Sequence, residues 1–354
     1  MMLISKTARL SFFPAIKIFC MLILVSAFFA GCSETTQLQQ KEKNSQAITW
    51  PPPPQKARIV FEREINFPRD ISKSTGFLNR VKELFLGKNM PLLIRPYGLA
   101  LDKKDNLLIV DTGGRLVHIF HLPDGKYRQI PAKKDNMVFL SPIDVDVAED
   151  GKIYVSDSVA KKVYVFNRDG LLETTIGEFM RPTGLVVDSL LEKLYVVDTM
   201  AHKIRVYNRT NGKLLFDLGQ RGEKPGEFNY PTNICLDTKG NLYVTDSMNF
   251  RVQIFGNDGG FLSSFGIAGD GPGAFSKPRG IAVDSDNHIY VVDAEFNNIQ
   301  IFNPKGHALL YFGTPGRKPG EFYLPAGILI DSNDRIYVSD SFNQRIQVFQ
   351  YVKE

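Results

Sequence analysis

Short apolar runs separated by turn residues fill the chain from Arg95 to its end. In the clearest copy, a run that opens with proline and closes with aspartate (278–284) is followed by a second run ending in aspartate (289–293) and a third run (299–302). No run is long and periodic enough for a helix, so we expect four short strands in each unit. The pattern therefore predicts an all-β chain.

Two markers recur in step through this region. The first is the proline that opens each unit: Pro96, Pro142, Pro182, Pro231, Pro278 and Pro325. The second is the aspartate that closes the second strand: Asp111, Asp157, Asp198, Asp246, Asp293 and Asp340. Both recur at intervals of about 40 to 50 residues, which is the size of a propeller blade. The chain is thus predicted to be a six-bladed β-propeller with four antiparallel strands per blade.

The sixth unit stops after its third strand. The predicted blades are residues 95–130, 141–177, 181–219, 230–266, 277–313 and 324–354. An unpaired outer edge would expose a row of backbone donors and acceptors. Residues 58–65 have strand character and no other place in the pattern, so we expect them to supply the missing outer strand and to close the ring.

Strand alternation places the loops after the second and fourth strands on one face. Because these loops are long, we expect them to display the function of the scaffold. The candidate contacts flank the opening prolines and should surround the channel mouth: Arg95, Tyr97, Arg181, Thr183, Tyr230, Thr232, Asn233, Lys277 and Arg279.

The repeat resembles the NHL repeat, most fully at residues 249–255 and 343–349, where Asn-x-Arg precedes an apolar strand. The resemblance covers the chain from about Arg95 to its end and implies a propeller of the NHL or TolB-like kind. Blade 2 departs from it, because Asp144 stands where the opening glycine belongs and Ala148 where the aspartate belongs.

The first residues resemble a bacterial lipoprotein signal. Lys6, Arg9 and Lys17 precede an apolar run (18–30) that is too short to span about 30 Å of hydrocarbon. Ala30 and Gly31 before Cys32 resemble a lipobox, which implies a signal peptide over residues 1–31, acylation of Cys32 with chains such as palmitate, and anchoring of the protein to a membrane of the bacterial envelope. Ser33 follows the cysteine, and by this resemblance we favour the outer membrane, on its periplasmic or surface side.

Two segments separate this signal from the repeats. Residues 32–55 are polar and rich in proline, which predicts an extended spacer before a propeller that begins at residue 56. Residues about 75–90 form the single helix-like stretch, with apolar positions on one stripe. We expect that helix to pack over the propeller, with a role in partner docking or membrane contact as the alternative.

Charge and cysteine content narrow the possible functions. Removing the three cations of the signal from the formal charge of +5 leaves +2, so there is no electrostatic argument for nucleic acid as a partner. Cys235 would be the remaining thiol beside the acylated one, in an apolar strand pattern that predicts a small buried side chain rather than a nucleophile.

The sequence motifs give little support to a catalytic function. A carboxylate that recurs at the same strand end in every unit most simply accepts hydrogen bonds from the backbone of the following loop. The histidines do not occupy equivalent inner positions, so we expect neither a metal site nor a cofactor, and we assign no catalytic residue. The favoured function is a binding or scaffold module for a protein, peptide, glycan or small ligand. The alternative is a metal-dependent propeller enzyme of the lyase or lactonase type.

Overall fold

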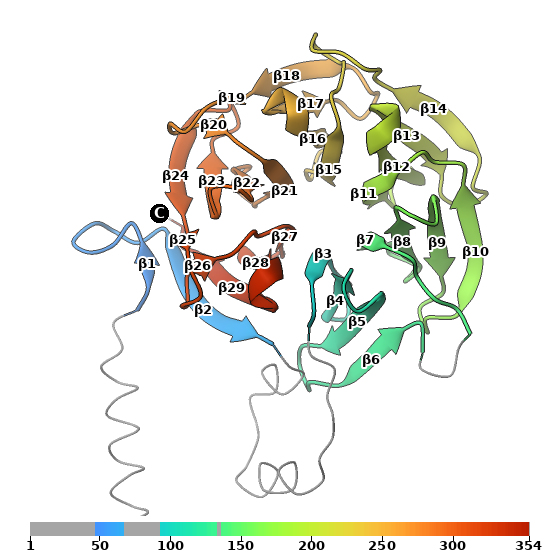
Figure 1. Cartoon of the computed structure of the whole chain (residues 1–354), viewed down its shortest axis with the longest axis horizontal. Helices are drawn as coiled ribbons and strands as arrows, with labels where there is room; N and C mark the ends of the chain where they lie inside the picture. Colours follow the sequence, from blue (N-terminus) through green and yellow to red (C-terminus); the bar gives the residue numbers. More distant parts are fainter. Residues whose placement is uncertain (1–46, 67–92, 133–135, 354) are drawn as a thin grey trace, which may run out of the picture. The chain divides into compact units, whose positions relative to one another are not determined.

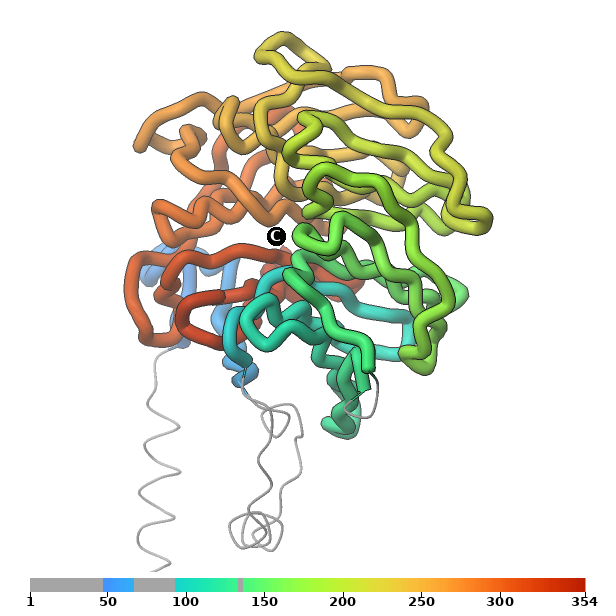
Figure 2. Tube along the Cα trace, turned by 45° about the vertical axis from the view of Figure 1, so that its right-hand side comes forward, coloured from blue at the N-terminus to red at the C-terminus, as the bar shows by residue number. Residues whose placement is uncertain are grey.

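A computed structural model describes residues 47–66, 93–132 and 136–353 of the chain, and Ile48–Glu354 form one compact unit. In this unit, six β-sheets are arranged around a common axis in chain order (Figure 1). The tube in Figure 2 follows the same order, with the blue N-terminal strand beside the red C-terminal segment. The predicted six-bladed all-β architecture is confirmed.

Five blades are antiparallel sheets whose strands follow each other in the chain. Blades 1 and 2 contain β3 (Pro96–Leu101), β4 (Asn106–Asp111), β5 (Leu116–His121), β6 (Tyr127–Ile130), β7 (Pro142–Val147), β8 (Ile153–Asp157), β9 (Lys162–Phe166) and β10 (Leu172–Gly177). Blade 3 contains β11 (Pro182–Asp188), β12 (Lys193–Asp198), β13 (Lys203–Asn208) and β14 (Leu214–Leu218). Blades 4 and 5 contain β15 (Pro231–Leu236), β16 (Leu242–Asp246), β17 (Arg251–Phe255), β18 (Phe261–Phe265), β21 (Pro278–Val283), β22 (Ile289–Asp293), β23 (Asn298–Phe302) and β24 (Ala308–Phe312).

The sixth blade combines both ends of the unit, in the order β1 (Thr49–Trp50), β2 (Ile59–Ile65), β29 (Arg345–Tyr351), β28 (Arg335–Asp340) and β27 (Ile328–Ile330). Short parallel pairs lie in two of the loops: β19 (Ile267–Ala268) with β20 (Ala274–Phe275), and β25 (Thr314–Pro315) with β26 (Glu321–Phe322). Single 3-10 turns follow three of the second strands: η2 (Thr199–Ala201), η3 (Ser247–Asn249) and η4 (Ser341–Asn343).

The hydrophobic core consists of layers between neighbouring blades. One cluster, for example, joins Val110 and Ile119 of blade 1 to Val145 and Val155 of blade 2. Other clusters repeat this arrangement around the ring, including one that joins blade 6 to blade 1. A middle strand such as β8 is buried along its whole length because both of its faces contact apolar side chains. The inner strands line the axis, and the outer strands face solvent.

The ring is closed by the strand that the sequence predicted. β2 pairs antiparallel with β29, from Ile59 opposite Tyr351 to Ile65 opposite Ile346. Side chains of the last blade also reach the first: the Ser339 and Ser341 hydroxyls donate to the carbonyl oxygens of residues 97 and 96 at 2.6 and 2.5 Å. Contacts between residues more than 240 positions apart therefore fasten the two ends of the propeller.

The propeller begins earlier than predicted, at residue 48 rather than 56. The Trp50 ring lies with its centroid 5.7 Å from those of both Phe312 and Phe349, and its edge covers Gly320. The Trp50 carbonyl accepts a 2.7 Å hydrogen bond from the amide of residue 58. A tryptophan at the start of the proline run supplies apolar surface that a polar spacer lacks, and so residues 49–51 pack against the last blade.

Several sequence predictions fall outside the described residues. These are the signal peptide at 1–31, acylated Cys32, the spacer up to residue 46, and the helix at about 75–90. Within the described ranges, the structure contains no helix that is both long and apolar enough to cross a membrane.

Candidate functional site

The six repeated aspartates organise the face that carries the long loops. Asp111 accepts hydrogen bonds from the amides of Ile94 (2.7 Å), Arg95 (2.9 Å) and Gly114 (2.7 Å). The first of these recurs in every blade: each aspartate binds the amide of the residue two positions before the opening proline. The sequence predicted bonds only to the following loop. In every blade the carboxylate also holds the preceding loop, and in blades 1, 2, 4, 5 and 6 a hydrogen bond to the following loop fixes both loops that border the channel mouth.

Blades 4 and 6 carry an additional polar network at this point. In blade 6, Arg345 donates to Asp340 (2.7 Å) and to Glu64 of the closing strand (2.6 Å), and Asn343 also donates to Asp340 (2.8 Å). Arg251 and Asn249 make the matching bonds to Asp246 in blade 4. Burial raises the pKa of both carboxyl groups above their ordinary value, although the arginines oppose that shift. The Asn-x-Arg signature is thus a loop-anchoring device in both blades.

Some of the predicted contact residues lie together in the structure, and the side chains of others form hydrogen bonds that hold strands and loops in place. Arg279 lies over the Tyr97 ring, with its guanidinium carbon 5.7 Å from the centroid, which links blades 5 and 1. The Thr183 hydroxyl donates to the carbonyl of residue 232 (2.9 Å), and the Thr232 hydroxyl bonds Ser247 (2.7 Å), so both threonines connect inner strands and loops. The remaining members are the exposed cations Arg95, Arg181 and Lys277, and Tyr230 and Asn233.

Tyr230 is held by the neighbouring blade. Its amide donates to Nδ1 of His202 (3.2 Å), and the two rings meet edge to face with centroids 4.4 Å apart. Its φ of 49° is in the left-handed region. Burial lowers the pKa of His202, which favours the neutral ring that this bond requires.

A set of exposed apolar side chains surrounds the predicted contacts, and sequence reasoning missed it. The members occupy two equivalent positions, two residues before the proline and two residues after the aspartate; blades 2, 3 and 6 supply both, and blades 1 and 4 supply one each. Each is 40% to 60% exposed: Ile94, Leu140, Val159, Met180, Met200, Met248, Tyr323 and Phe342. We call this set the mouth ring. Blade 5 interrupts it with Ser276 and Glu295.

Cations are interleaved with the mouth ring. The Arg95 guanidinium carbon lies 5.0 Å from the centroid of Phe342, which itself packs against Tyr323 at 5.4 Å. Arg181 and Lys277 occupy the same position as Arg95 in blades 3 and 5 and are exposed. The face therefore combines apolar contact area with positive charge.

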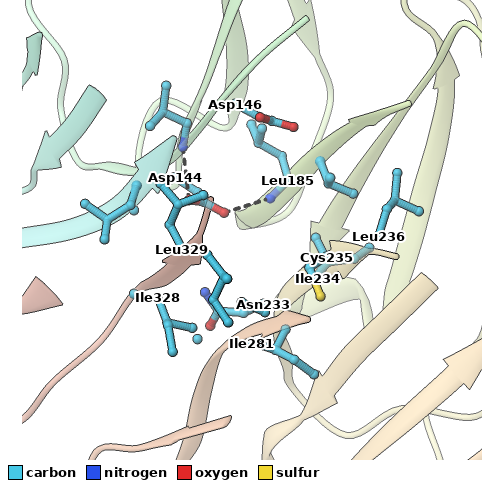
Figure 3. A pocket seen from close by; sticks show the side chains of 18 of the residues that line it. Asp144, Asp146, Leu185, Asn233, Ile234, Cys235, Leu236, Ile281, Ile328 and Leu329 are labelled. Atoms are coloured by element: carbon cyan, nitrogen blue, oxygen red, sulfur yellow. Dashed lines mark hydrogen bonds between the residues drawn. The ribbon is translucent and has the colours of Figure 1, made fainter. Parts of the chain in front are cut away.

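Below the mouth, the inner strands of all six blades line a cavity of about 230 Å³ (Figure 3). Asp144, Asp146 and Asn233 are its polar side chains, and Oδ1 of Asn233 is buried without a hydrogen-bond partner. The cavity is smaller than the usual range of about 300–1,000 Å³ for sites that bury a drug-sized ligand. It has room for water molecules or a small solute.

Two carboxyl groups of the channel bridge blade 2 to blade 3. Asp144 accepts from the amide of Leu185 (3.1 Å), as the dashed line in Figure 3 shows, and Asp146 from the amide of Val187 (2.7 Å). Burial raises the pKa of Asp144 to about 8 and that of Asp146 to about 6. In the sequence, Asp144 stands out only as a departure from the repeat. The alternation Asp-Val-Asp, which turns both carboxyl groups to one face of a strand, was the available signal.

Other groups at the channel have limited chemistry. Cys235, predicted to be buried, is half-buried and lines the channel, and burial raises the pKa of its thiol well above the ordinary value. Residues 47–66, 93–132 and 136–353 contain no group of three His, Cys, Asp or Glu side chains that could hold a metal ion.

Short segments of this chain are similar in sequence to known proteins. Human Tripartite motif-containing protein 2 is 42% identical over 52 residues, which is 15% of this chain and 7% of that protein. Protein lin-41 of Caenorhabditis elegans is 43% identical over 49 residues, which is 14% of this chain and 4% of that protein. The chain therefore matches less than a tenth of the length of these curated relatives.

Solved structures share the fold at low sequence identity. Virginiamycin B lyase from Staphylococcus aureus is 16% identical, with a TM-score of 0.55 over 82% of this chain and 99% of that chain. An auxiliary nutrient binding protein from Bacteroides thetaiotaomicron is 15% identical, with a TM-score of 0.59 over 74% of this chain and 70% of that chain.

One family accounts for most of the repeat region. The family DUF5128, described as a 6-bladed beta-propeller, matches residues 132–215, 230–299 and 285–352. These segments cover more than half of the chain and include strands from blades 2 to 6. The protein therefore belongs to the DUF5128 family of six-bladed β-propellers.

Proposed function

We propose that this protein is a lipid-anchored binding module of the bacterial envelope, and that its mouth ring binds a protein or peptide partner. The observation that carries the proposal is the gathering of eight large, exposed apolar side chains around the channel mouth. Exposed apolar groups that cluster on one face of a rigid scaffold mark interaction sites, whereas scattered ones need no explanation.

The composition of the mouth ring favours a polypeptide over the other ligands that the sequence allowed. Met180, Met200 and Met248 are flexible and polarisable, so they adapt to the side chains of a partner. Tyr323 and Phe342 supply rigid aromatic area, and Arg95 lies beside them. Aromatic, methionine and arginine side chains are the types enriched in protein interfaces. The channel itself has too little volume for a large ligand, and so the face rather than the channel is the proposed contact area.

The anchoring part of the proposal depends on sequence features. A cationic start, a short apolar run and the lipobox-like residues before Cys32 support export and acylation, and the NHL-like repeat supports a recognition role. Envelope lipoproteins act beside other envelope components, so we expect the partner to be a protein of the same compartment.

Site-specific crosslinking tests the proposed face. A photoreactive p-benzoylphenylalanine is placed at Met200 or Phe342 of the full-length protein in intact cells, and at the exposed outer-strand positions Leu215 and Leu262 as matched controls. We expect a discrete crosslinked partner from the first two positions and none from the controls. Crosslinks of equal yield from both sets would contradict a specific mouth-ring site.

Acylation has a separate test. Metabolic labelling with a palmitate analogue should mark the wild-type protein and leave a Cys32→Ser variant unmarked. A label that persists in the variant would refute Cys32 as the acylation site without affecting the binding proposal.

A further inference from the structure

The turns between third and fourth strands normally seal the grooves between blades. A side-chain atom added at Gly170 of blade 2 would lie 3.0 Å from Ile130 of blade 1, so this turn packs directly on the neighbouring outer strand. An atom added at Gly306 of blade 5 would lie 2.5 Å from Phe265 of blade 4. Gly212 of blade 3 and Gly259 of blade 4 likewise lie against the outer strands of blades 2 and 3.

Blade 6 has no such turn, because its third and fourth strands come from opposite ends of the unit. β29 ends at Tyr351 and β2 begins at Ile59, and no hairpin joins them. At this junction with blade 5 lies a cavity of about 620 Å³, which we call the seam cavity. Its lining residues are Pro51, Arg58, Ile59, Asp286, His288, Tyr290, Ile301, Leu309, Leu310 and Tyr351. The cavity is thus a consequence of how the ring closes.

One side of the seam cavity is apolar. Leu310 is half-buried and presents apolar surface to the cavity, while the other apolar lining residues Ile59, Ile301 and Tyr290 are buried. Leu309 is 53% exposed and lies at the entrance. The volume falls within the range of about 300–1,000 Å³ that is typical of small-molecule sites. The cavity can therefore enclose an apolar body of moderate size.

The other side carries an ordered polar network. Asp286 is exposed, and its carboxylate accepts a 3.1 Å hydrogen bond from the Tyr351 hydroxyl. Asp284 accepts from Tyr290 (3.0 Å) and bonds Nδ1 of His288 (3.0 Å), whose ring meets Tyr351 with centroids 5.6 Å apart. The position of the Asp286 carboxylate is therefore supported by a tyrosine that is itself packed.

The charge around this network is negative. The carboxylates of Asp284, Asp286 and Asp334 outnumber the cations of Arg58 and Lys353, and Lys353 is paired with Asp334 at 3.0 Å. A ligand with a positive end would gain a charge-assisted hydrogen bond at Asp286, a bond that a carboxylate group cannot form with that side chain.

We propose that the seam cavity binds a small amphipathic amine, with its apolar body against Leu309 and Leu310 and its ammonium group at Asp286. This site is separate from the mouth ring and goes beyond the proposed function. It would allow the propeller to bind a small molecule and a polypeptide at the same time.

Calorimetric titration of the full-length protein in detergent tests the site. The probe is 3-phenylpropylamine, and 3-phenylpropionate has the same body with the opposite charge. We expect saturable binding of the amine at about one per chain, and at least about tenfold weaker binding of the acid, which corresponds to about 1.4 kcal/mol. No saturable binding of the amine, or equal affinity for both probes, would overturn the proposal.

Two variants with matched controls locate the binding. Leu309→Trp should close the entrance and Asp286→Asn should remove the anion, each weakening amine binding at least about tenfold. Leu262→Trp, at the equivalent position of blade 4, and Asp105→Asn, in the corresponding turn of blade 1, should leave it unchanged. If Leu309→Trp fails to fold, the surface variant Asp286→Asn decides alone. Binding that survives both seam variants, or that is lost equally in the controls, refutes the seam cavity as the site.

Discussion

Replacing Ile65 with alanine should open the ring at its seam. The side chain is fully buried between blades 6 and 1, in a cluster that includes Leu107 and Tyr337. Isoleucine-to-alanine changes at such positions lower the free energy of unfolding by about 2–5 kcal/mol, because they lose apolar burial and leave a cavity. A domain is stable by about 5–15 kcal/mol in total, so the variant should fold with a clearly reduced margin.

Ile130→Ala provides the matched comparison. Ile130 is 1% exposed and lies on the outer strand of blade 1, so it loses the same atoms from an equivalent position. The two sites differ in connectivity, because β6 follows β5 in one hairpin whereas β2 pairs with a strand from the far end of the chain. We therefore expect Ile65→Ala to weaken the seam locally as well as the whole fold.

Urea denaturation and hydrogen exchange separate these two effects. Both variants should lose about 2–5 kcal/mol in denaturation. Exchange of the β2 and β29 amides should accelerate by about a hundredfold in Ile65→Ala, since each 1.4 kcal/mol is a factor of ten. The same amides should be much less affected in Ile130→Ala. A loss below about 1 kcal/mol with unchanged exchange in β29 would refute the reasoning that a borrowed strand locks the propeller.

Three further outcomes follow from the channel and the anchored loops. Because burial raises the pKa of Asp144 to about 8 and of Asp146 to about 6, the folded state holds more protons than the unfolded state above pH 4, so the free energy of unfolding should fall by about 5 kcal/mol from pH 5 to pH 8.5. A double asparagine variant should lose most of that slope in thermal melts, and an unchanged slope would contradict it. Gly98→Ala places a side-chain atom 2.6 Å from the Cα of Asp144, so it should lower the free energy of unfolding by about 1–3 kcal/mol in denaturant titrations. A change close to zero would contradict this expectation. Arg345→Met leaves Asp340 buried without its cation and should lower the free energy of unfolding by about 3–5 kcal/mol. The control is Arg251→Met, which retains the ion pair between Arg345 and Glu64 at the seam and should not alter hydrogen exchange in β2.

Strand positions and blade number were predictable because they depend on local patterns. Proline, apolar alternation and a closing aspartate recur within each unit, and each marks a strand end through its own backbone chemistry. The closing strand was also predictable, since an unpaired edge in blade 6 required a partner and residues 58–65 alone offered one. The membership of Trp50 was missed, because proline runs favour spacers and its aromatic partners lie some 260 to 300 residues away.

The candidate site was only partly predictable for a similar reason. The positions beside the opening prolines indicated Arg95, Tyr97 and Arg279 as candidates, but they could not show that Arg279 stacks on Tyr97, because the two residues belong to blades that are not adjacent in the chain. Thr183 and Thr232 lie at the predicted positions, yet neighbouring strands occupy their hydroxyls. Burial and pairing of such side chains depend on the spacing between blades.

By itself, the sequence determined the repeat, the number of blades, the strand that closes them and the loops that share a face, because each is encoded in local periodicity and turn chemistry. Only the tertiary structure decided which side chains form the mouth ring, why the pKa values of Asp144 and Asp146 are raised, and where the seam cavity opens. Those properties arise from distances between residues remote in sequence, and such distances exist only once the blades have packed into a closed ring.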